Sequence, residues 1–277
     1  MTPLVSVCIP AYGAERFIAL ALESVLTQSF ADFEVIVVDD ASPDRTAEIA
    51  SAFGDERVQV HRNPQNLGAA ANWDAVVARA QGAYIKLLCS DDTLYPTCLA
   101  REVEVLERYP DVVLVSAQRD IIDDRGVVIA PRRGIRQLEG RIEGRDAIQR
   151  IVRSGANLVG EPSAALARAD ALRACGPFNP DAAYVLDLDM WFRLLQRGDF
   201  FGIAEPLCTF RVSSSSWSAH LVSQQASQVR RFFRAAHERN LVTRRDAVVG
   251  QTRATALAYA RRIAFRRVRR RVLSSPQ

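Results

Sequence analysis

The first 115 residues alternate between short apolar runs and longer amphipathic stretches. Five runs that are rich in apolar and β-branched residues predict strands, at 4–9, 33–39, 57–62, 83–89 and 111–117. The stretches between them predict helices, at 14–29, 44–54, 69–82 and 96–110. Strands and helices that alternate at this spacing are typical of βαβ units. We therefore predict an α/β fold with a mostly parallel central sheet.

The pattern becomes less regular after residue 116. It predicts a hairpin around Asp124–Gly126, and then in order a short helix, a strand, a helix, a further helix and a strand, the last of them ending near residue 212. Residues 220–272 have helical periodicity and a basic composition. We predict one domain over residues 1–218, with halves 1–115 and 116–218, followed by a basic helical extension over 219–277.

Composition indicates a globular protein of a reducing compartment. The chain has 277 residues, of which 48% are hydrophobic and 25% charged. Its N-terminus "MTPLVSVCIP" resembles a first strand rather than a secretory signal, and no apolar run approaches the ~18–20 residues of a membrane span. Five scattered cysteines without a C-x-x-C pair argue against a disulfide or zinc framework. We expect a cytoplasmic location.

Basic charge is concentrated near the C-terminus. The net charge is +4, every basic residue except Lys86 is arginine, and no acidic residue follows Asp246. The tail "ARRIAFRRVRRRVLSSPQ" has three interpretations: peripheral contact with the inner membrane face, a helix for a partner or for oligomerisation, and a solvated tail. Nucleic-acid binding is not favoured, because no recognised nucleic-acid-binding fold accompanies the charge.

Polar segments follow the predicted strands of the first half, at the edge where parallel sheets bind ligands. They are "PAYG", "DDASPD", "HRNPQNLG" and "CSDD". Asp39 continues its strand and should point toward the ligand, where an acceptor-only side chain can bind a base N–H or a ribose hydroxyl. The alternative is a turn in which Asp40, Ser42 or Asp44 caps the next helix.

Two further groups of carboxylates suggest chemistry. Asp91 and Asp92 are adjacent at a strand end, and like charges so close favour a neighbouring cation such as a divalent ion that bridges to a diphosphate. A solvated turn is the alternative. Asp187 and Asp189 open a helix and point to different sides, so one can complement the helix dipole while the other serves as a general base.

Several enzyme classes are disfavoured by absent motifs. Neither G-x-G-x-x-G nor a Walker A pattern is present, which argues against dinucleotide oxidoreductases and P-loop NTPases. No order of Ser, His and Asp indicates a nucleophilic triad. The three histidines are more typical of surface or structural positions.

Three segments together resemble a known family. "VSVCIPAYGAERFIALALESVLTQSFADFEVIVVDDASPDRT", "NLGAAANWDAVVARAQGAYIKLLCSDDTLYP" and "DLDMWFRLL" resemble family-two-type inverting glycosyltransferases that use nucleotide sugars. The resemblance implies a GT-A, Rossmann-like three-layer sandwich with a nucleotide-binding half (1–115) and an acceptor half (116–218). It also implies transfer from a nucleoside-diphosphate sugar, with UDP favoured, to a glycan or lipid-linked acceptor in cell-envelope polysaccharide biosynthesis.

The resemblance also assigns roles to residues. Asp187 would be the general base of a single displacement, and Asp92 would bind Mn²⁺ or Mg²⁺. The residues that it assigns to the nucleotide are Pro10, Ala11, Tyr12, Asp39, Asp91 and Arg211; we also predict nucleotide contacts for Asn66 and Lys86.

The chain departs from the family pattern at three positions. Cys89 and Leu186 stand where many members have acidic residues, and Ser213 stands where many have a histidine, for which His220 is a candidate substitute. Two alternatives therefore stay open: a nucleotidyltransferase on the same fold, and a degenerate module that binds a nucleotide or glycan without catalysis.

Overall fold

The computed structural model describes residues 2–212 and 225–273, with side chains at 2–212 and 226–259. Within the first half, strands and helices alternate in the predicted order, although all four helices are shorter than predicted. Their bounds are β1 Val5–Ala11, α1 Ile18–Leu26, β2 Phe33–Asp39, α2 Thr46–Ser51, β3 Val58–Arg62, α3 Ala69–Val77, β4 Tyr84–Leu87 and α4 Cys98–Arg108.

The second half contains the predicted hairpin and the predicted helices. Its elements are β5 Val112–Ile122, β6 Val128–Arg133, β7 Gly140–Ile142, α5 Gly144–Ser154, η1 Pro162–Ala164, β8 Ala165–Arg168, α6 Ala169–Ala174, η2 Pro180–Val185, α7 Leu186–Leu195, β9 Asp199–Arg211, α9 Gln225–Glu238 and α10 Arg244–Leu273. Among the residues that the structure describes, no helix has both the length and the apolar character of a membrane span.

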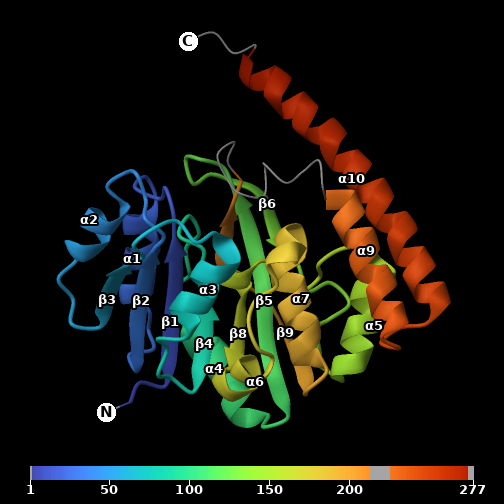
Figure 1. Ribbon diagram of the computed structural model, residues 1–277, viewed down its shortest axis with the longest axis horizontal. Coiled ribbons are helices and arrows are strands. Elements are labelled where there is room, and N and C mark those ends of the chain that lie inside the picture. Colours follow the sequence, from blue (N-terminus) through green and yellow to red (C-terminus); the bar gives the residue numbers. More distant parts are fainter. Residues whose placement is uncertain (1, 213–224, 274–277) are drawn as a thin grey trace.

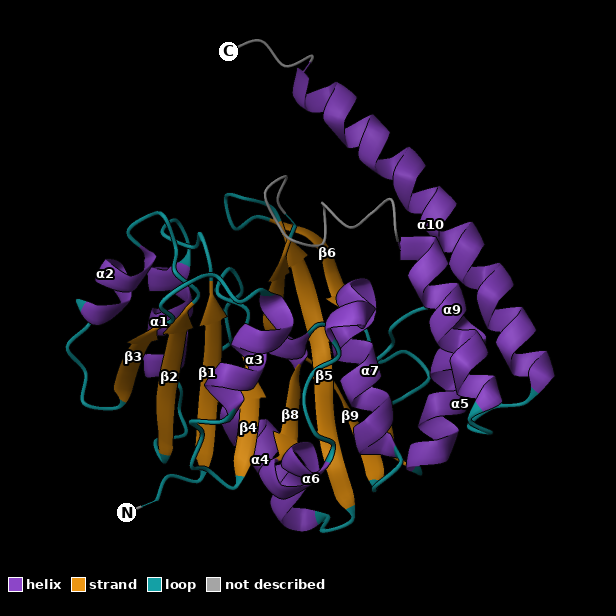
Figure 2. Ribbon diagram, viewed as in Figure 1, coloured by secondary structure: helices purple, strands orange, loops and turns teal. Residues whose placement is uncertain are grey.

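One sheet runs through the whole molecule in the order β3-β2-β1-β4-β8-β5-β9-β7, with β6 beside β5 (Figure 2). Strands β3, β2, β1 and β4 are parallel, as are β5 and β9. Strand β8 lies antiparallel between β4 and β5, a reversal that the sequence did not predict. The predicted α/β fold with a mostly parallel central sheet is confirmed.

Helices cover both faces of this sheet and make three layers (Figure 1). Val7 and Ile9 of β1 face a core with α1, α2 and α4, while Cys8 between them faces a core with α3, α5, α6 and α7. The alternation arises because successive side chains of a strand point to opposite faces. The ligand edge of the sheet is therefore held rigidly from both sides.

The alternation of side chains along β4 also corrects the role predicted for Lys86. Ile85 and Leu87 face the α3 side, so Lys86 points under α4, where its ammonium is fully buried and lies 2.6 Å from a carboxylate oxygen of Glu102. The predicted contact between Lys86 and a nucleotide is therefore wrong. Lys86 forms a structural ion pair in the core.

The C-terminal helices pack on the second half of the domain. Phe232 of α9 lies 4.8 Å from the ring of Phe192 on α7. Helix α10 approaches α5 so closely that a Cβ on Gly250 would lie 2.2 Å from the carbonyl oxygen of Val152. The core thus includes α9 and the beginning of α10. The predicted boundary at 218/219 lies outside the described residues and stays a prediction.

Candidate functional site

The polar segments that follow β1, β2 and β4 meet at one edge of the sheet, as expected for parallel strands (Figure 2). Ala11 pairs in register with Asp39, and its carbonyl oxygen accepts a hydrogen bond from the N–H of Asp40 at 2.8 Å. Tyr12 follows directly and is 56% exposed. An exposed aromatic ring beside a buried carboxylate offers a stacking surface next to a hydrogen-bond acceptor.

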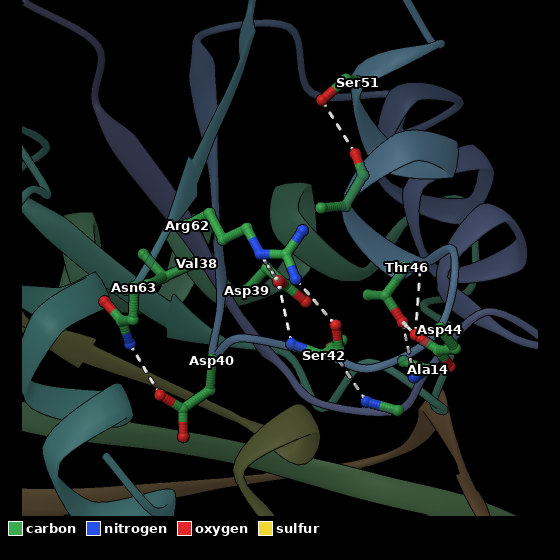
Figure 3. Close-up of polar contacts among 12 residues, drawn as sticks. Ala14, Val38, Asp39, Asp40, Ser42, Asp44, Thr46, Ser51, Arg62 and Asn63 are labelled. Atoms are coloured by element: carbon green, nitrogen blue, oxygen red, sulfur yellow. Dashed lines mark hydrogen bonds and ion pairs between the residues drawn. The ribbon is translucent and has the colours of Figure 1, made fainter. Parts of the chain in front are cut away.

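Asp39 is fully buried, and only one of its two carboxylate oxygens has a partner among the described residues. Its Oδ2 accepts a hydrogen bond from the N–H of Ser42 at 3.1 Å and lies 3.3 Å from Nε of Arg62 (Figure 3). Its Oδ1 is buried and has no hydrogen-bond partner among the described residues. An unsatisfied buried acceptor costs free energy, so this oxygen is suited to a donor group supplied by a ligand.

Asp40 points to the other side of the strand and has a structural role. Its Oδ1 accepts hydrogen bonds from Nδ2 of Asn63 (Figure 3) and from the N–H of Leu67, and its Oδ2 accepts one from the N–H of Gly68. These bonds fix the loop between β3 and α3. Asn66, the predicted nucleotide contact, is exposed in that loop and stays a prediction.

The two adjacent carboxylates differ in accessibility, and the difference argues against Asp92 as the predicted metal ligand. Asp92 is fully buried: its Oδ2 accepts a 2.6 Å hydrogen bond from the hydroxyl of Ser163, and its Oδ1 accepts one from the N–H of Arg211 at 2.8 Å. Burial and the charge of Asp91 raise the pKa of Asp92 well above its usual range. Asp91 is only partly buried, so Asp91 rather than Asp92 is the candidate metal ligand.

The Arg211 side chain stabilises the backbone around Asp91. Its Nε donates to the carbonyl oxygen of Asp91, its Nη1 donates to that of Asp123, and its guanidinium lies 4.4 Å above the ring of Phe17. The side chain is almost completely buried. Its predicted contact with the nucleotide is therefore replaced by a structural role.

Cys89 does not supply the missing metal ligand. Burial and the nearby carboxylates of Asp92 and Asp91 raise the pKa of its thiol well above the usual value, and a soft sulfur ligand does not suit Mg²⁺ or Mn²⁺, which prefer oxygen. No group of three or more His, Cys, Asp or Glu side chains within residues 2–212 and 226–259 has the arrangement of a metal site. The donors that remain, one partly exposed carboxylate and a ligand's phosphates, fit an ion such as Mg²⁺ that uses few protein oxygens.

Asp187 lies in the first turn of α7 and is only partly buried. Its Oδ2 accepts a 2.9 Å hydrogen bond from Nδ2 of Asn157, and its Oδ1 accepts one from the N–H of Leu188. Desolvation raises its pKa to about 7, despite the hydrogen bond from Leu188. Asp189 points away and pairs with Arg193 at 2.9 Å. The alternation thus leaves Asp187 as the candidate base.

Sequence reasoning missed the residues that connect the carboxylates. Asn157 holds Asp187, whereas Ser163 donates to Asp92 and accepts a hydrogen bond from the N–H of Cys89 at 3.1 Å. Both lie in "NLVGEPS", the segment between α5 and β8 that runs into the short 3-10 helix η1. Ser213 and His220 lie outside the described residues.

Relatives and solved structures share this architecture. An uncharacterised protein of Mycobacterium tuberculosis is 33% identical over 70% of this chain and 63% of its own length. A putative teichuronic acid biosynthesis glycosyltransferase of Bacillus subtilis, TuaG, is 40% identical over 38% of this chain and 42% of its own. The chain therefore spans less than two thirds of the length of either relative.

Two solved structures have the same fold. S. aureus TarS in complex with UDP-GlcNAc matches with a TM-score of 0.65 and 18% identity, over 81% of this chain and 66% of that one. The mannosyltransferase PcManGT of Pyrobaculum calidifontis, in complex with GDP-Man and Mn²⁺, matches with a TM-score of 0.62 and 18% identity, over 94% and 76%. The expected GT-A fold is confirmed. The family model of glycosyl transferase family 2 matches residues 6–175, and the chain belongs to this family.

Proposed function

We propose that this protein transfers a sugar from a nucleoside diphosphate to an acceptor hydroxyl, by a single displacement that inverts the anomeric carbon. The observation that carries the proposal is the unsatisfied, buried Oδ1 of Asp39 beside the exposed ring of Tyr12, at the ligand edge of a family 2 fold. Two fold neighbours are complexes with nucleotide sugars, TarS with UDP-GlcNAc and PcManGT with GDP-Man.

Asp39 would recognise the base of the nucleotide. Its Oδ1 would accept the ring N–H that uracil and guanine both carry, while Tyr12 would stack on the base. Pro10 and Ala11 would line the pocket from β1. We favour UDP as the nucleotide, and titration with UDP and GDP compares the two candidates directly.

Asp39→Asn should weaken UDP binding by about tenfold or more, since a hydrogen bond to a charged group is worth ~1.5–3 kcal/mol. The N–H of Ser42 and the Nε of Arg62 would hold the amide oxygen at the Oδ2 position, which directs the NH₂ toward the ring N–H. Calorimetry with UDP and Mn²⁺ measures the change, with the exposed Asp32→Asn as the matched control. Equal affinities in all three proteins would exclude Asp39 from the base pocket.

A divalent ion, Mn²⁺ or Mg²⁺, would be held by Asp91, with phosphate and water oxygens completing its shell. When bound, such an ion neutralises charge on the diphosphate leaving group. Asp92 would act indirectly, because its hydrogen bonds with Ser163 and Arg211 fix the backbone that carries Asp91.

Asp91→Asn should abolish the dependence of UDP affinity on Mn²⁺, because it removes the one partly exposed carboxylate of the pair. The measurement is the UDP dissociation constant with a chelator divided by the UDP dissociation constant with Mn²⁺. The ratio should exceed one in the wild type and fall to about one in the variant. A variant that keeps the wild-type ratio would refute Asp91 as the ligand.

Asp187 would be the general base. Its carboxylate would take the proton of the acceptor hydroxyl as that oxygen attacks the anomeric carbon from the face opposite the diphosphate. The bond between the anomeric carbon and the phosphate oxygen breaks, and its electrons leave with the nucleotide. A pKa of about 7 suits this role, because a base works best near the operating pH. Asn157 keeps the carboxylate oriented.

The acceptor would be a glycan or a lipid-linked glycan in envelope polysaccharide biosynthesis, in keeping with the name of TuaG. Comparing transfer to free and to lipid-linked acceptors would decide between them.

The three interpretations of the arginine-rich tail stay open, because the side chains beyond Tyr259 are not described. Family membership disfavours the nucleotidyltransferase alternative. Donor turnover would distinguish an enzyme from a binding module without catalysis.

A further inference from the structure

A short segment between α5 and β8, residues 157–163, connects the two chemical ends of the site; we call it the bridge segment. At one end, Asn157 donates to Asp187 and also to the carbonyl oxygen of Gly160 at 3.0 Å. At the other end, the hydroxyl of Ser163 donates to Asp92. The bridge segment therefore runs from the proposed base to the paired carboxylates on the donor side.

Glu161 lies in the middle of the bridge segment and pairs with Arg119 of β5. The Arg119 side chain is only 9% exposed, whereas that of Glu161 is 28% exposed. Arg119 thus fixes the carboxylate from the protein side and leaves part of it open to a ligand. Both side chains belong to the acceptor half, outside the residues that we assign to the nucleotide.

Two glycines form the slot that holds Arg119. A Cβ on Gly134 would lie 2.0 Å from its Nη1, and a Cβ on Gly160 would lie 2.7 Å from the same atom. Both glycines have positive φ angles, 90° and 105°, which other residues rarely adopt. The pair is therefore built into the backbone and is not a chance contact of two surface side chains.

The charge of Glu161 acts on the proposed base. It raises the pKa of Asp187, after the larger effect of desolvation. Under the proposed function, the transferred sugar lies between the diphosphate near Asp91 and the base Asp187. The partly exposed carboxylate of Glu161 lies on the protein segment that spans this interval.

We propose that Glu161, held by Arg119, determines donor specificity: it accepts hydrogen bonds from hydroxyls of a neutral sugar and excludes sugars that carry a carboxylate. This inference rests on the proposed function. A carboxylate accepts hydroxyl hydrogen bonds strongly, but it repels a second carboxylate in a partly desolvated site. The donor class would therefore be a neutral hexose, deoxyhexose or N-acetylhexosamine rather than a uronic acid.

The test compares donors that differ only in oxidation at C6. Dissociation constants are measured with Mn²⁺ for UDP-glucose against UDP-glucuronate and UDP-galactose against UDP-galacturonate, or for GDP-mannose against GDP-mannuronate if GDP binds better than UDP. The wild type should prefer the neutral sugar by about tenfold or more, as expected for ~1.4 kcal/mol of repulsion. Glu161→Gln should bring the ratio of the two dissociation constants, uronate donor over neutral donor, to about one. The affinity for UDP alone should stay unchanged.

Controls separate specificity from folding. Glu139→Gln, which neutralises an exposed glutamate before β7, should keep the wild-type ratio. Because Glu161→Gln leaves the Arg119 charge buried, the double variant Arg119→Met/Glu161→Gln removes both charges and should give the same loss of discrimination. If UDP binds but the wild-type ratio is near one, or both variants keep it, the inference is overturned. If neither UDP nor GDP binds, the proposed function itself fails, and the inference fails with it.

Discussion

Asp187→Asn is expected to lower the rate of sugar transfer by about 10²–10⁴-fold while leaving the affinity for UDP and Mn²⁺ unchanged. The amide cannot take a proton from the acceptor hydroxyl, and Asp187 lies outside the residues assigned to the nucleotide. It would still accept the hydrogen bond of the Leu188 N–H, so α7 should keep its first turn. The measurement is donor turnover at saturating donor, together with calorimetry of UDP binding.

Asp189→Asn is the matched control for this prediction. Asp189 lies two residues later on the same helix, is nearly buried and pairs with Arg193 instead of facing Asn157. Its amide variant should therefore lose some stability but keep the transfer rate per folded molecule within about twofold, since effects away from reacting groups are small. Equal losses in both variants would point to a general disturbance of α7. A fully active Asp187→Asn would exclude Asp187 as the base.

Lys86→Met is expected to lower the free energy of unfolding by about 3–5 kcal/mol, because it leaves the carboxylate of Glu102 buried and uncompensated. Chemical denaturation measures the loss as a shift of the unfolding midpoint. At denaturant concentrations too low to unfold the variant, its affinity for UDP should equal that of the wild type. A nucleotide affinity that falls without any loss of stability would return Lys86 to the nucleotide site.

A double variant shows that the loss comes from the uncompensated charge rather than from packing. Lys86→Met combined with Glu102→Leu removes both charges and fills the space between β4 and α4 with apolar groups. Such replacements of buried ion pairs are often neutral or stabilising, so the double variant should recover most of the stability. If it is as unstable as the single variant, packing rather than the charge of Glu102 dominates.

The strands show how much of the fold and of the candidate site could be predicted from the sequence. Runs of apolar residues located β1 to β5, and the ends of those strands located Asp39 and Asp91, because parallel strands place their carboxyl ends together. The burial of Lys86 could also be predicted, since this residue alternates with Ile85 and Leu87 on a buried strand. The predicted contact between Lys86 and the nucleotide did not take this alternation into account.

Long-range contacts explain what the sequence could not show. Which of Asp91 and Asp92 is accessible depends on Ser163 and Arg211, which lie 71 and 119 residues from Asp92 along the chain. Strand β8 reverses the direction of the sheet between β4 and β5, so the bridge segment reaches the ligand edge. No local periodicity encodes such an arrangement, and Arg211 fits the family pattern at its position while its side chain is buried.

The central claim is that Asp187 acts as the base in a nucleotide-sugar transferase, and the pH dependence of kcat/KM for transfer tests it most directly. Because the pKa of Asp187 is raised to about 7, its carboxyl is protonated and inactive below that pH and ionised above it. The account predicts a rate that rises with pH and levels off above an apparent pKa of about 7, with this limb absent in Asp187→Asn. A wild-type profile that is flat from about pH 5 to pH 8, or a limb that persists in the variant, would contradict it.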